Sequence, residues 1–202
     1  FGSALRLEGV AEFLEGLDRY SRCKDYPAEF GARVFKIARD EQGARLTYLK
    51  VTGGSLRVKQ PLRTGREEGK DGEEKADQLR VYSGMAYTPV QEATAGMVCA
   101  VTGLSRTYAG QGLGAETEPL TPLLEPVLVY RLLLPPGCDL PRIFTRLKTL
   151  EEEEPQLHVV WEETTGEILA QVMGEVQMEI LKSRITERCN VEVGFGTGSI
   201  VY

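Results

Sequence analysis

The sequence is poor in the side chains that build metal sites and disulfide frameworks. It has one histidine, and none of its cysteines forms a C-x-x-C pair. Zinc sites need closely spaced Cys and His ligands, and disulfide-stapled domains need paired cysteines, so neither class is favoured. The cysteines are Cys23, Cys99, Cys138 and Cys189. We expect no metal in this chain and a reducing, cytoplasmic compartment.

Catalytic motifs are also missing. The sequence contains neither a Gly-rich phosphate loop with its Lys and Ser or Thr nor a nucleophile elbow. The lone His158 stands beside Leu157 and Val159, a setting more typical of a strand residue than of a general base. The G-x-G-x-G that begins at Gly110 follows no βα unit and is interpreted as linker. We therefore predict no catalytic residue and no cofactor in this chain.

No apolar run approaches the roughly 20 residues that span a bilayer, so no membrane partner is expected. The first residue is Phe1 rather than Met, and Tyr202 follows directly on the apolar Ile200 and Val201. Both ends therefore look cut from a longer protein.

Charge is distributed unevenly along the chain. The formal net charge is -6, yet residues 31–66 hold nine basic and two acidic residues, a net of +7, which leaves -13 for the rest. Within this window Leu56 and Val58 alternate with Arg57 and Lys59, which gives one strand an apolar and a basic face. Such a face either contacts phosphate or is simply solvated.

Residues 1–118 read as a short helix followed by a small barrel. Apolar residues at 10, 13, 14 and 17 predict a helix over 9–18. Alternating segments at 33–39, 44–51, 56–59, 78–82 and 96–102, separated by Gly-containing turns, predict hairpins that close into a barrel. Residues 64–77, rich in Gly, Glu, Lys and Asp, are expected to form a mobile loop.

A Gly- and Pro-rich linker is expected at 110–126, and a second domain after it. Strands at 127–134, 157–161, 167–172 and 190–195 and helices at 139–154 and 174–188 give the order β-α-β-β-α-β, which is the ferredoxin-like, split βαβ arrangement of an α+β domain. The acidic run Glu151 to Glu154 at the end of the first helix opposes the helix dipole, so we expect it to fray into solvent or to face a basic partner.

Several segments together resemble elongation factor G and its relatives. They are Phe35-Lys-Ile, Gly43-x-Arg-Leu-Thr-Tyr, Val51-Thr-Gly-Gly-Ser-Leu, Ala95-Gly-Met-Val-Cys-Ala-Val-Thr-Gly-Leu, Thr165-Gly-Glu-Ile and Met173-Gly-Glu-Val-Gln-Met-Glu-Ile. The resemblance implies the end of the G domain and a linker at 1–27, the translation-factor β-barrel domain II at 28–118 and the ferredoxin-like domain III at 119–202.

The resemblance also implies functional residues and partners. Ser3 and Ala4 would be the remnant of a motif that helps to hold the guanine ring. Arg57, Lys59, Arg63 and Arg66 would contact the backbone of small-subunit rRNA. The full-length parent would be a ribosome-dependent GTPase that uses GTP and Mg²⁺. Its partners would be the ribosome, mainly small-subunit rRNA and protein, together with its own G domain and C-terminal domains.

One motif bears on the subfamily. Elongation factor G usually has Gly-Glu-Leu-His-Leu-Glu where this chain has Gly174-Glu-Val-Gln177-Met178-Glu, which is similar to the ribosomal protection proteins that confer tetracycline resistance. A protection protein that releases tetracycline from the ribosome is therefore the first hypothesis. A translocating elongation factor G is the alternative, and a stand-alone RNA-binding or adaptor module is the alternative of another class.

Overall fold

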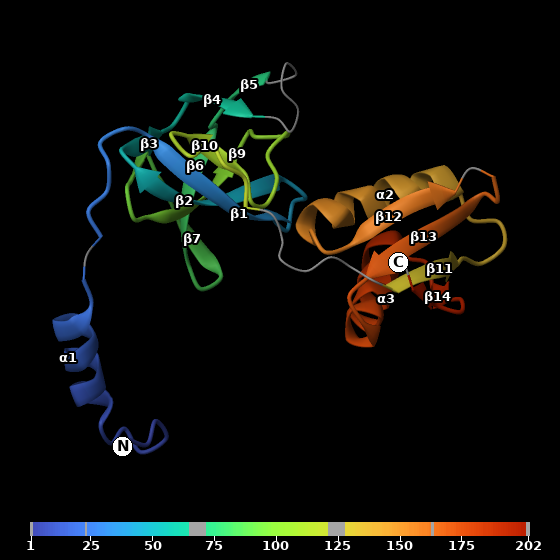
Figure 1. Ribbon diagram of the computed structural model, residues 1–202, viewed down its shortest axis with the longest axis horizontal. Helices are drawn as coiled ribbons and strands as arrows, with labels where there is room; N and C mark the ends of the chain where they lie inside the picture. The colour runs from blue at the N-terminus through green and yellow to red at the C-terminus, as the bar shows by residue number, and fades with distance from the viewer. Residues whose placement is uncertain (1, 23, 65–71, 121–127, 163, 201–202) are drawn as a thin grey trace.

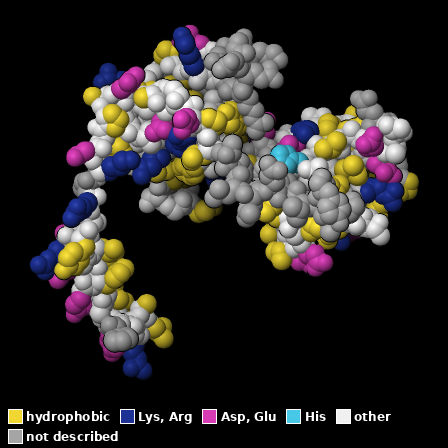
Figure 2. All heavy atoms as spheres, viewed as in Figure 1, with side chains coloured by type: hydrophobic (Ala, Val, Ile, Leu, Met, Phe, Trp, Pro, Cys, Tyr) yellow, Lys and Arg dark blue, Asp and Glu magenta, His cyan; other side chains and the backbone are white. Residues whose placement is uncertain are grey.

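The computed structural model describes residues 2–22, 24–64, 72–120, 128–162 and 164–200. In it the chain forms a leading helix, a β-rich lobe and a mixed α/β lobe (Figure 1). Helix α1 (Val10–Tyr20) matches the predicted helix, but none of its residues is buried. Its apolar face is open, with Phe13 at 64% and Leu14 at 57% exposure, and hydrophobic side chains are visible on its surface (Figure 2). No helix among the described residues is both long and apolar enough to cross a membrane.

The β-rich lobe is a barrel, as predicted. Its strands are β1 (Gly31–Arg39), β2 (Arg45–Gly53), β3 (Ser55–Arg57), β4 (Pro61–Thr64), β5 (Gly72–Lys75), β6 (Gln78–Ser83), β7 (Ala86–Val90), β8 (Glu92–Thr94), β9 (Val98–Thr102) and β10 (Gly112–Gly114). Six of them form an antiparallel sheet in the order β10-β1-β2-β9-β6-β7, and the ladders β3-β8 and β4-β5 complete the lobe. The sheet and both ladders contribute buried side chains to one core, among them Leu49, Leu56 and Leu62.

The turn between β1 and β2 forms because its residues satisfy the backbone locally. The Asp40 carboxylate accepts hydrogen bonds from the backbone N–H groups of Gln42 and Ala44 at 3.1 and 2.8 Å. Gly43 has a φ of 82°, a conformation that costs glycine least. This turn fixes the register from Arg39 and Arg45 up to Lys36 and Tyr48, which sends Ile37 into the core.

Two sequence interpretations of the barrel were wrong in part. Within the expected loop at 64–77, residues Gly72–Lys75 form β5, which pairs with β4, while residues 65–71 lie outside the described part. Within the expected linker, Gly112–Gly114 form β10 at the edge of the sheet, and Leu113 is buried in the core. A Cβ at residue 112 would clash with the Glu116 carbonyl oxygen, so this glycine allows a close backbone contact.

The second lobe has the predicted β-α-β-β-α-β order. Its elements are β11 (Leu128–Leu133), α2 (Leu140–Glu153), β12 (His158–Glu162), β13 (Glu167–Val172), α3 (Glu175–Cys189), β14 (Gly194–Phe195) and β15 (Ser199–Ile200). The strand order β12-β13-β11-β14 is that of a ferredoxin-like sheet, and β15 also pairs with β11. Side chains from both helices and the sheet form its core, including Leu147, Ile168 and Ile185.

The start of helix α2 and the end of helix α3 each have an identifiable cause. Asp139 caps it by accepting a hydrogen bond from the Arg142 backbone N–H at 3.1 Å, and Pro141 lies in the first turn. The strand expected at 190–195 is shorter than predicted. Asn190 instead ends α3 in the left-handed conformation, so pairing starts only at Gly194.

Candidate functional site

The predicted basic residues lie along one side of the β3-β4 segment. Arg57 ends β3, Lys59 follows in the turn with a φ of 66°, and Arg63 lies on β4, while Leu56 and Leu62 point into the core. Arg57, Lys59 and Arg63 are all exposed, and we call them the basic strip. The fourth candidate, Arg66, lies outside the described residues. The structure therefore exposes all three of the described candidates on the β3-β4 segment.

Two members of the basic strip have acidic partners. Arg57 Nε lies 3.1 Å from Glu92 Oε1, and Lys59 Nζ lies 2.5 Å from Asp77 Oδ1. Hydrogen bonds from Ser55 and Arg57 lower the pKa of Glu92, so this carboxylate stays ionised. Both ion pairs are solvent-exposed and therefore weak, so both cations can exchange these partners for a phosphate at little cost.

Ser3 and Ala4 form a compact turn ahead of α1. The backbone of Ser3 pairs with that of Glu8 in an isolated bridge, and the Ser3 carbonyl also accepts a hydrogen bond from the Arg6 N–H at 3.2 Å. Ser3 is half-buried and Ala4 is exposed. Their contact with guanine stays a prediction.

The acidic run at the end of α2 faces arginines, contrary to the solvated interpretation. From the barrel, Arg45 Nε lies 3.1 Å from Glu152, and Arg39 lies 3.7 Å from Glu152 and 3.8 Å from Glu153. From α3, Arg188 binds both oxygens of Glu153 at 2.6 and 2.8 Å. The pairs from Arg39 and Arg45 join the two lobes, and the pair from Arg188 lies within the second lobe. All of them compensate the unfavourable charges at the helix end.

Arg45 is the best anchored residue of this junction. Its guanidinium donates to the carbonyl oxygens of Leu104 and Thr107 at 2.7 and 2.6 Å and to the Thr107 hydroxyl at 2.9 Å. Its side chain is only 13% exposed. Contacts within the barrel alone therefore position the guanidinium for its ion pair with Glu152 of the second lobe. The sequence motif around Arg45 does not reveal this role, because Leu104, Thr107 and Glu152 lie 59 to 107 residues away.

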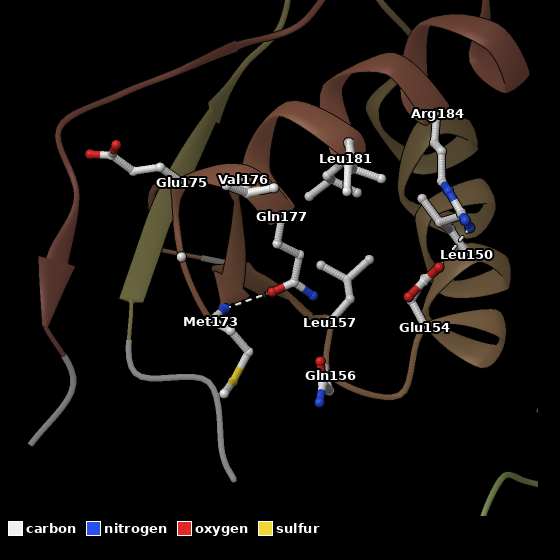
Figure 3. Close-up of a pocket in the computed structure, with 12 residues that line it drawn as sticks. Leu150, Glu154, Gln156, Leu157, Met173, Glu175, Val176, Gln177, Leu181 and Arg184 are labelled. Atoms are coloured by element: carbon white, nitrogen blue, oxygen red, sulfur yellow. Dashed lines mark hydrogen bonds and ion pairs between the residues drawn. The ribbon is translucent and has the colours of Figure 1, made fainter. Parts of the chain in front are cut away.

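Gln177, the residue that bears on the subfamily, stabilises the start of α3. Its Oε1 accepts a hydrogen bond from the Met173 backbone N–H at 2.6 Å (Figure 3). As the third residue of the helix it satisfies a donor just before the helix, much as the acidic residue of a capping box does. It also lines a groove of about 650 Å³, where Arg184 pairs with Glu154 at 2.8 Å.

We expect Gln177→Ala to lower the free energy of unfolding of the second lobe by about 1 kcal/mol, because the Met173 N–H loses its partner. Chemical denaturation followed by Trp161 fluorescence measures this, since Trp161 lies in the same lobe. The control is Gln156→Ala, which lines the same groove from an exposed position. Equal effects from both variants would contradict a capping role.

A second surface, not foreseen from the sequence, lies on the outer side of the barrel sheet. It consists of Phe35, Tyr48, Tyr82 and Tyr87, which we call the aromatic strip. Successive ring centroids are 6.2, 5.6 and 5.4 Å apart, within the range of favourable aromatic pairs. Burial, together with the neighbouring Tyr82, raises the pKa of Tyr48 to about 12, so its hydroxyl stays protonated.

Asp40 and Arg80 form an ion pair at the edge of the aromatic strip. Arg80 Nη1 lies 2.9 Å from Asp40 Oδ2, and this hydrogen bond, with those from Ala44 and Gln42, lowers the pKa of Asp40. A folded-state pKa below the unfolded value of about 3.9 makes the ionised carboxylate stabilising above that value. This stabilisation is lost as the pH falls through the lowered pKa.

We therefore expect wild-type thermal stability to fall more steeply below about pH 4 than that of Asp40→Asn. Melting curves between pH 2 and pH 7 measure the difference, with Asp18→Asn on the exposed helix α1 as the control. Parallel curves for wild type and Asp40→Asn would contradict the assignment.

No group of three or more His, Cys, Asp or Glu side chains among the described residues is arranged to hold a metal ion. The prediction of a metal-free chain concerns the whole sequence and stays a prediction. Cys99 is buried, and this burial raises the pKa of its thiol to about 11, which makes it a structural rather than a reactive cysteine.

The two lobes, a barrel followed by a ferredoxin-like domain, each match a family model. The family model for elongation factor G domain 2 matches residues 29–115, and that for elongation factor G domain III matches residues 125–197. Together these adjacent matches cover most of the chain. The chain therefore belongs to the elongation factor G family, and it holds domains II and III of that family.

Similar proteins agree with this assignment. The chain is 28% identical to elongation factor G 2 of Syntrophus aciditrophicus over 92% of its own length and 27% of the relative's. It is 28% identical to elongation factor G of Ureaplasma urealyticum over 97% of this chain and 30% of the relative. A crystal structure of a protein from Thermus thermophilus has a TM-score of 0.74 at 27% identity and covers 95% of this chain and 30% of that one. The chain thus spans less than a third of the length of each of these proteins.

Proposed function

We propose that this chain is the ribosome-docking middle region of a GTP-dependent ribosomal protection protein, which releases tetracycline from the ribosome. The membership in the elongation factor G superfamily supports a translational GTPase as the parent. Phosphate loop and magnesium site would lie in the parent's G domain, so GTP and Mg²⁺ belong to the parent and not to domains II and III. Such a factor works in the cytoplasm, where ribosomes are.

Within this proposal the barrel supplies the docking surface. Arg57, Lys59 and Arg63 project from one side of the β3-β4 segment, and cations arranged in this way contact rRNA backbone without reading its sequence. Arg66 is proposed to extend the same surface. Ser3 and Ala4 are proposed to contribute to the guanine site of the parent.

The observation that carries the protection hypothesis is the sequence Gly174-Glu-Val-Gln177-Met178-Glu at the start of α3. There the side-chain amide of Gln177 accepts a hydrogen bond from the Met173 backbone N–H, just before α3. The alternative is a translocation factor of the elongation factor G type, which the similarity to the two bacterial elongation factors G supports.

Drug retention on ribosomes separates the two. Ribosomes loaded with labelled tetracycline are mixed with the full-length parent and either GTP, a non-hydrolysable GTP analogue or GDP. Release with GTP or its analogue but not with GDP supports protection. Retained drug together with ribosome-stimulated GTP hydrolysis supports the translocation factor. No ribosome-stimulated hydrolysis at all would leave the stand-alone RNA-binding or adaptor module as the better hypothesis.

A further inference from the structure

A β-bulge and one small residue allow the rings of the aromatic strip to follow one another without a gap. In the β1-β2 register Val34 faces Leu49 and Lys36 faces Tyr48, so Phe35 is the extra residue of the bulge. Phe35 and Lys36 are therefore both exposed on the outside of the barrel. On β9, Ala100 is the register partner of both Tyr48 and Arg80, and its small side chain leaves the rings of Tyr48 and Tyr82 in contact.

A pocket of about 390 Å³ opens on this strip. The rings of Tyr48, Tyr82 and Tyr87 line it, together with residues of the turns β1-β2 and β6-β7. Met85 in the β6-β7 turn is 93% exposed. The volume falls in the range of about 300–1,000 Å³ found for small-ligand sites. It therefore suits a single nucleotide better than a docked helix of a partner protein.

Charged residues of both signs surround the rings. Asp40 and Glu41 also line the pocket, and Asp40 is paired with Arg80. Cations lie over two of the rings, and this favours a nucleic acid. Lys36 Nζ lies 5.9 Å from the centre of the Tyr48 ring, and the Arg80 guanidinium lies 4.4 Å from that of Tyr87. Lys50, two residues after Tyr48 on the same face of β2, is also exposed. Among the described residues neither lysine forms an ion pair, so both are available to the phosphates on either side of a base.

We infer that the aromatic strip stacks unpaired RNA bases, with Lys36 and Lys50 contacting the adjoining phosphates. Open sheet faces that carry aromatic rings bind single-stranded nucleic acid in this way, because every base offers a π-face to a ring. The inference rests on the proposed function, in which the RNA is ribosomal. It adds a base-stacking surface to the phosphate contacts of the basic strip, from which it is distinct.

The test uses a single-stranded RNA hexanucleotide with a central 2-aminopurine, whose fluorescence is quenched on stacking. The 202-residue chain should quench it and should bind it more tightly than the same strand in a duplex. Phe35→Leu and Tyr87→Leu keep an apolar side chain without a π-face. Each should weaken binding roughly 5- to 100-fold, the range for loss of one base stack, without changing the salt dependence.

Lys36→Gln should instead make the log-log salt slope shallower by about 0.7, the value for one phosphate contact on a single strand. Tyr20→Leu on α1, an exposed tyrosine outside the strip, is the matched control and should change nothing. Melting curves identify any variant that has lost its fold. Equal binding of single strand and duplex, or unchanged affinity in both folded leucine variants, would overturn the inference.

Ribosome binding by the full-length parent, measured with the same substitutions, separates this inference from the proposed function. If the leucine variants weaken ribosome binding but the chain does not quench the probe, the strip contacts a ribosomal protein, and base stacking is wrong while docking stands. A wild-type parent that does not bind ribosomes would overturn the proposed function itself.

Discussion

Arg45→Ala should lower the free energy of unfolding of the barrel by about 3 kcal/mol. The substitution removes the hydrogen bonds that the guanidinium donates to Leu104 and Thr107 and leaves those carbonyl oxygens without their charged donor. It also removes the ion pair with Glu152 that joins the lobes. Breaking a mostly buried network of hydrogen bonds and an ion pair is one of the few kinds of substitution with an effect of this size.

Denaturant unfolding of the barrel, followed by tyrosine fluorescence or circular dichroism, measures this loss. Arg45→Lys should recover little of it, because an ammonium lacks the planar fork that reaches both carbonyls. The control is Arg57→Ala, whose side chain is 71% exposed and whose solvent-exposed ion pair should contribute little to stability. A loss below about 1 kcal/mol for Arg45→Ala would show that the junction does not depend on this residue.

Glu152→Ala tests the junction without disturbing the barrel. Glu152 is 44% exposed and contacts the barrel through Arg45 and Arg39. Barrel stability should change by less than about 1 kcal/mol, since Arg45 keeps its other partners. Increased interdomain motion, seen by fluorescence energy transfer between labelled lobes, is the expected result, and an unchanged distribution of distances would contradict a role in joining the lobes.

Replacing Arg57, Lys59 and Arg63 together by Gln should weaken ribosome binding of the full-length parent about 100-fold near physiological salt. This estimate assigns about 1 kcal/mol to each exposed phosphate contact. The log-log salt slope should also become shallower by about 2 to 3, because each phosphate contact accounts for about 0.7–0.9. Both changes follow from phosphate contact, whereas a strip that is only solvated would produce neither.

Filter binding or sedimentation at several salt concentrations measures both quantities. The control replaces Arg19, Lys24 and Lys182 by Gln, which removes the same charge from exposed positions outside the basic strip. If both triple variants lose the same affinity, net charge rather than the basic strip is responsible. Unchanged binding in the first variant would assign these three residues to solubility alone.

The sequence predicted most of the fold because its local signals agree with its long-range packing. Asp40 and Gly43 specify a turn, and Asp139 and Pro141 specify a helix start, whatever the rest of the chain does. Alternation at Leu56 and Arg57 likewise set which side of β3 is buried. The ferredoxin-like order then followed from the sequence of strands and helices.

The errors share a physical cause. Residues 72–75 have the composition of a loop, and β5 forms because β4 offers a neighbouring edge and because Glu74 binds Ser105 and Arg106 across the barrel. Gly112 and Gly114 look like linker, yet only glycine fits beside Glu116 and Phe30. In each case distant residues decide the conformation, and local composition does not record them.

The candidate site was predictable only in its local part. Arg57, Lys59 and Arg63 are close in sequence, and their alternation with apolar residues revealed a basic face. The aromatic strip joins β1, β2, β6 and β7, and a bulge that no motif announces brings Phe35 to the same face as Lys36. The arginines that meet Glu152 and Glu153 come from the barrel and from α3, so the acidic run alone could not identify them.

The most direct test of ribosome docking is an electron cryo-microscopy structure of the full-length parent, bound to the ribosome with a non-hydrolysable GTP analogue. We expect the β3-β4 segment to lie on small-subunit rRNA, with Arg57, Lys59 and Arg63 within reach of phosphate oxygens. A bound factor whose barrel directs these three side chains into solvent, with no rRNA contact, would contradict it.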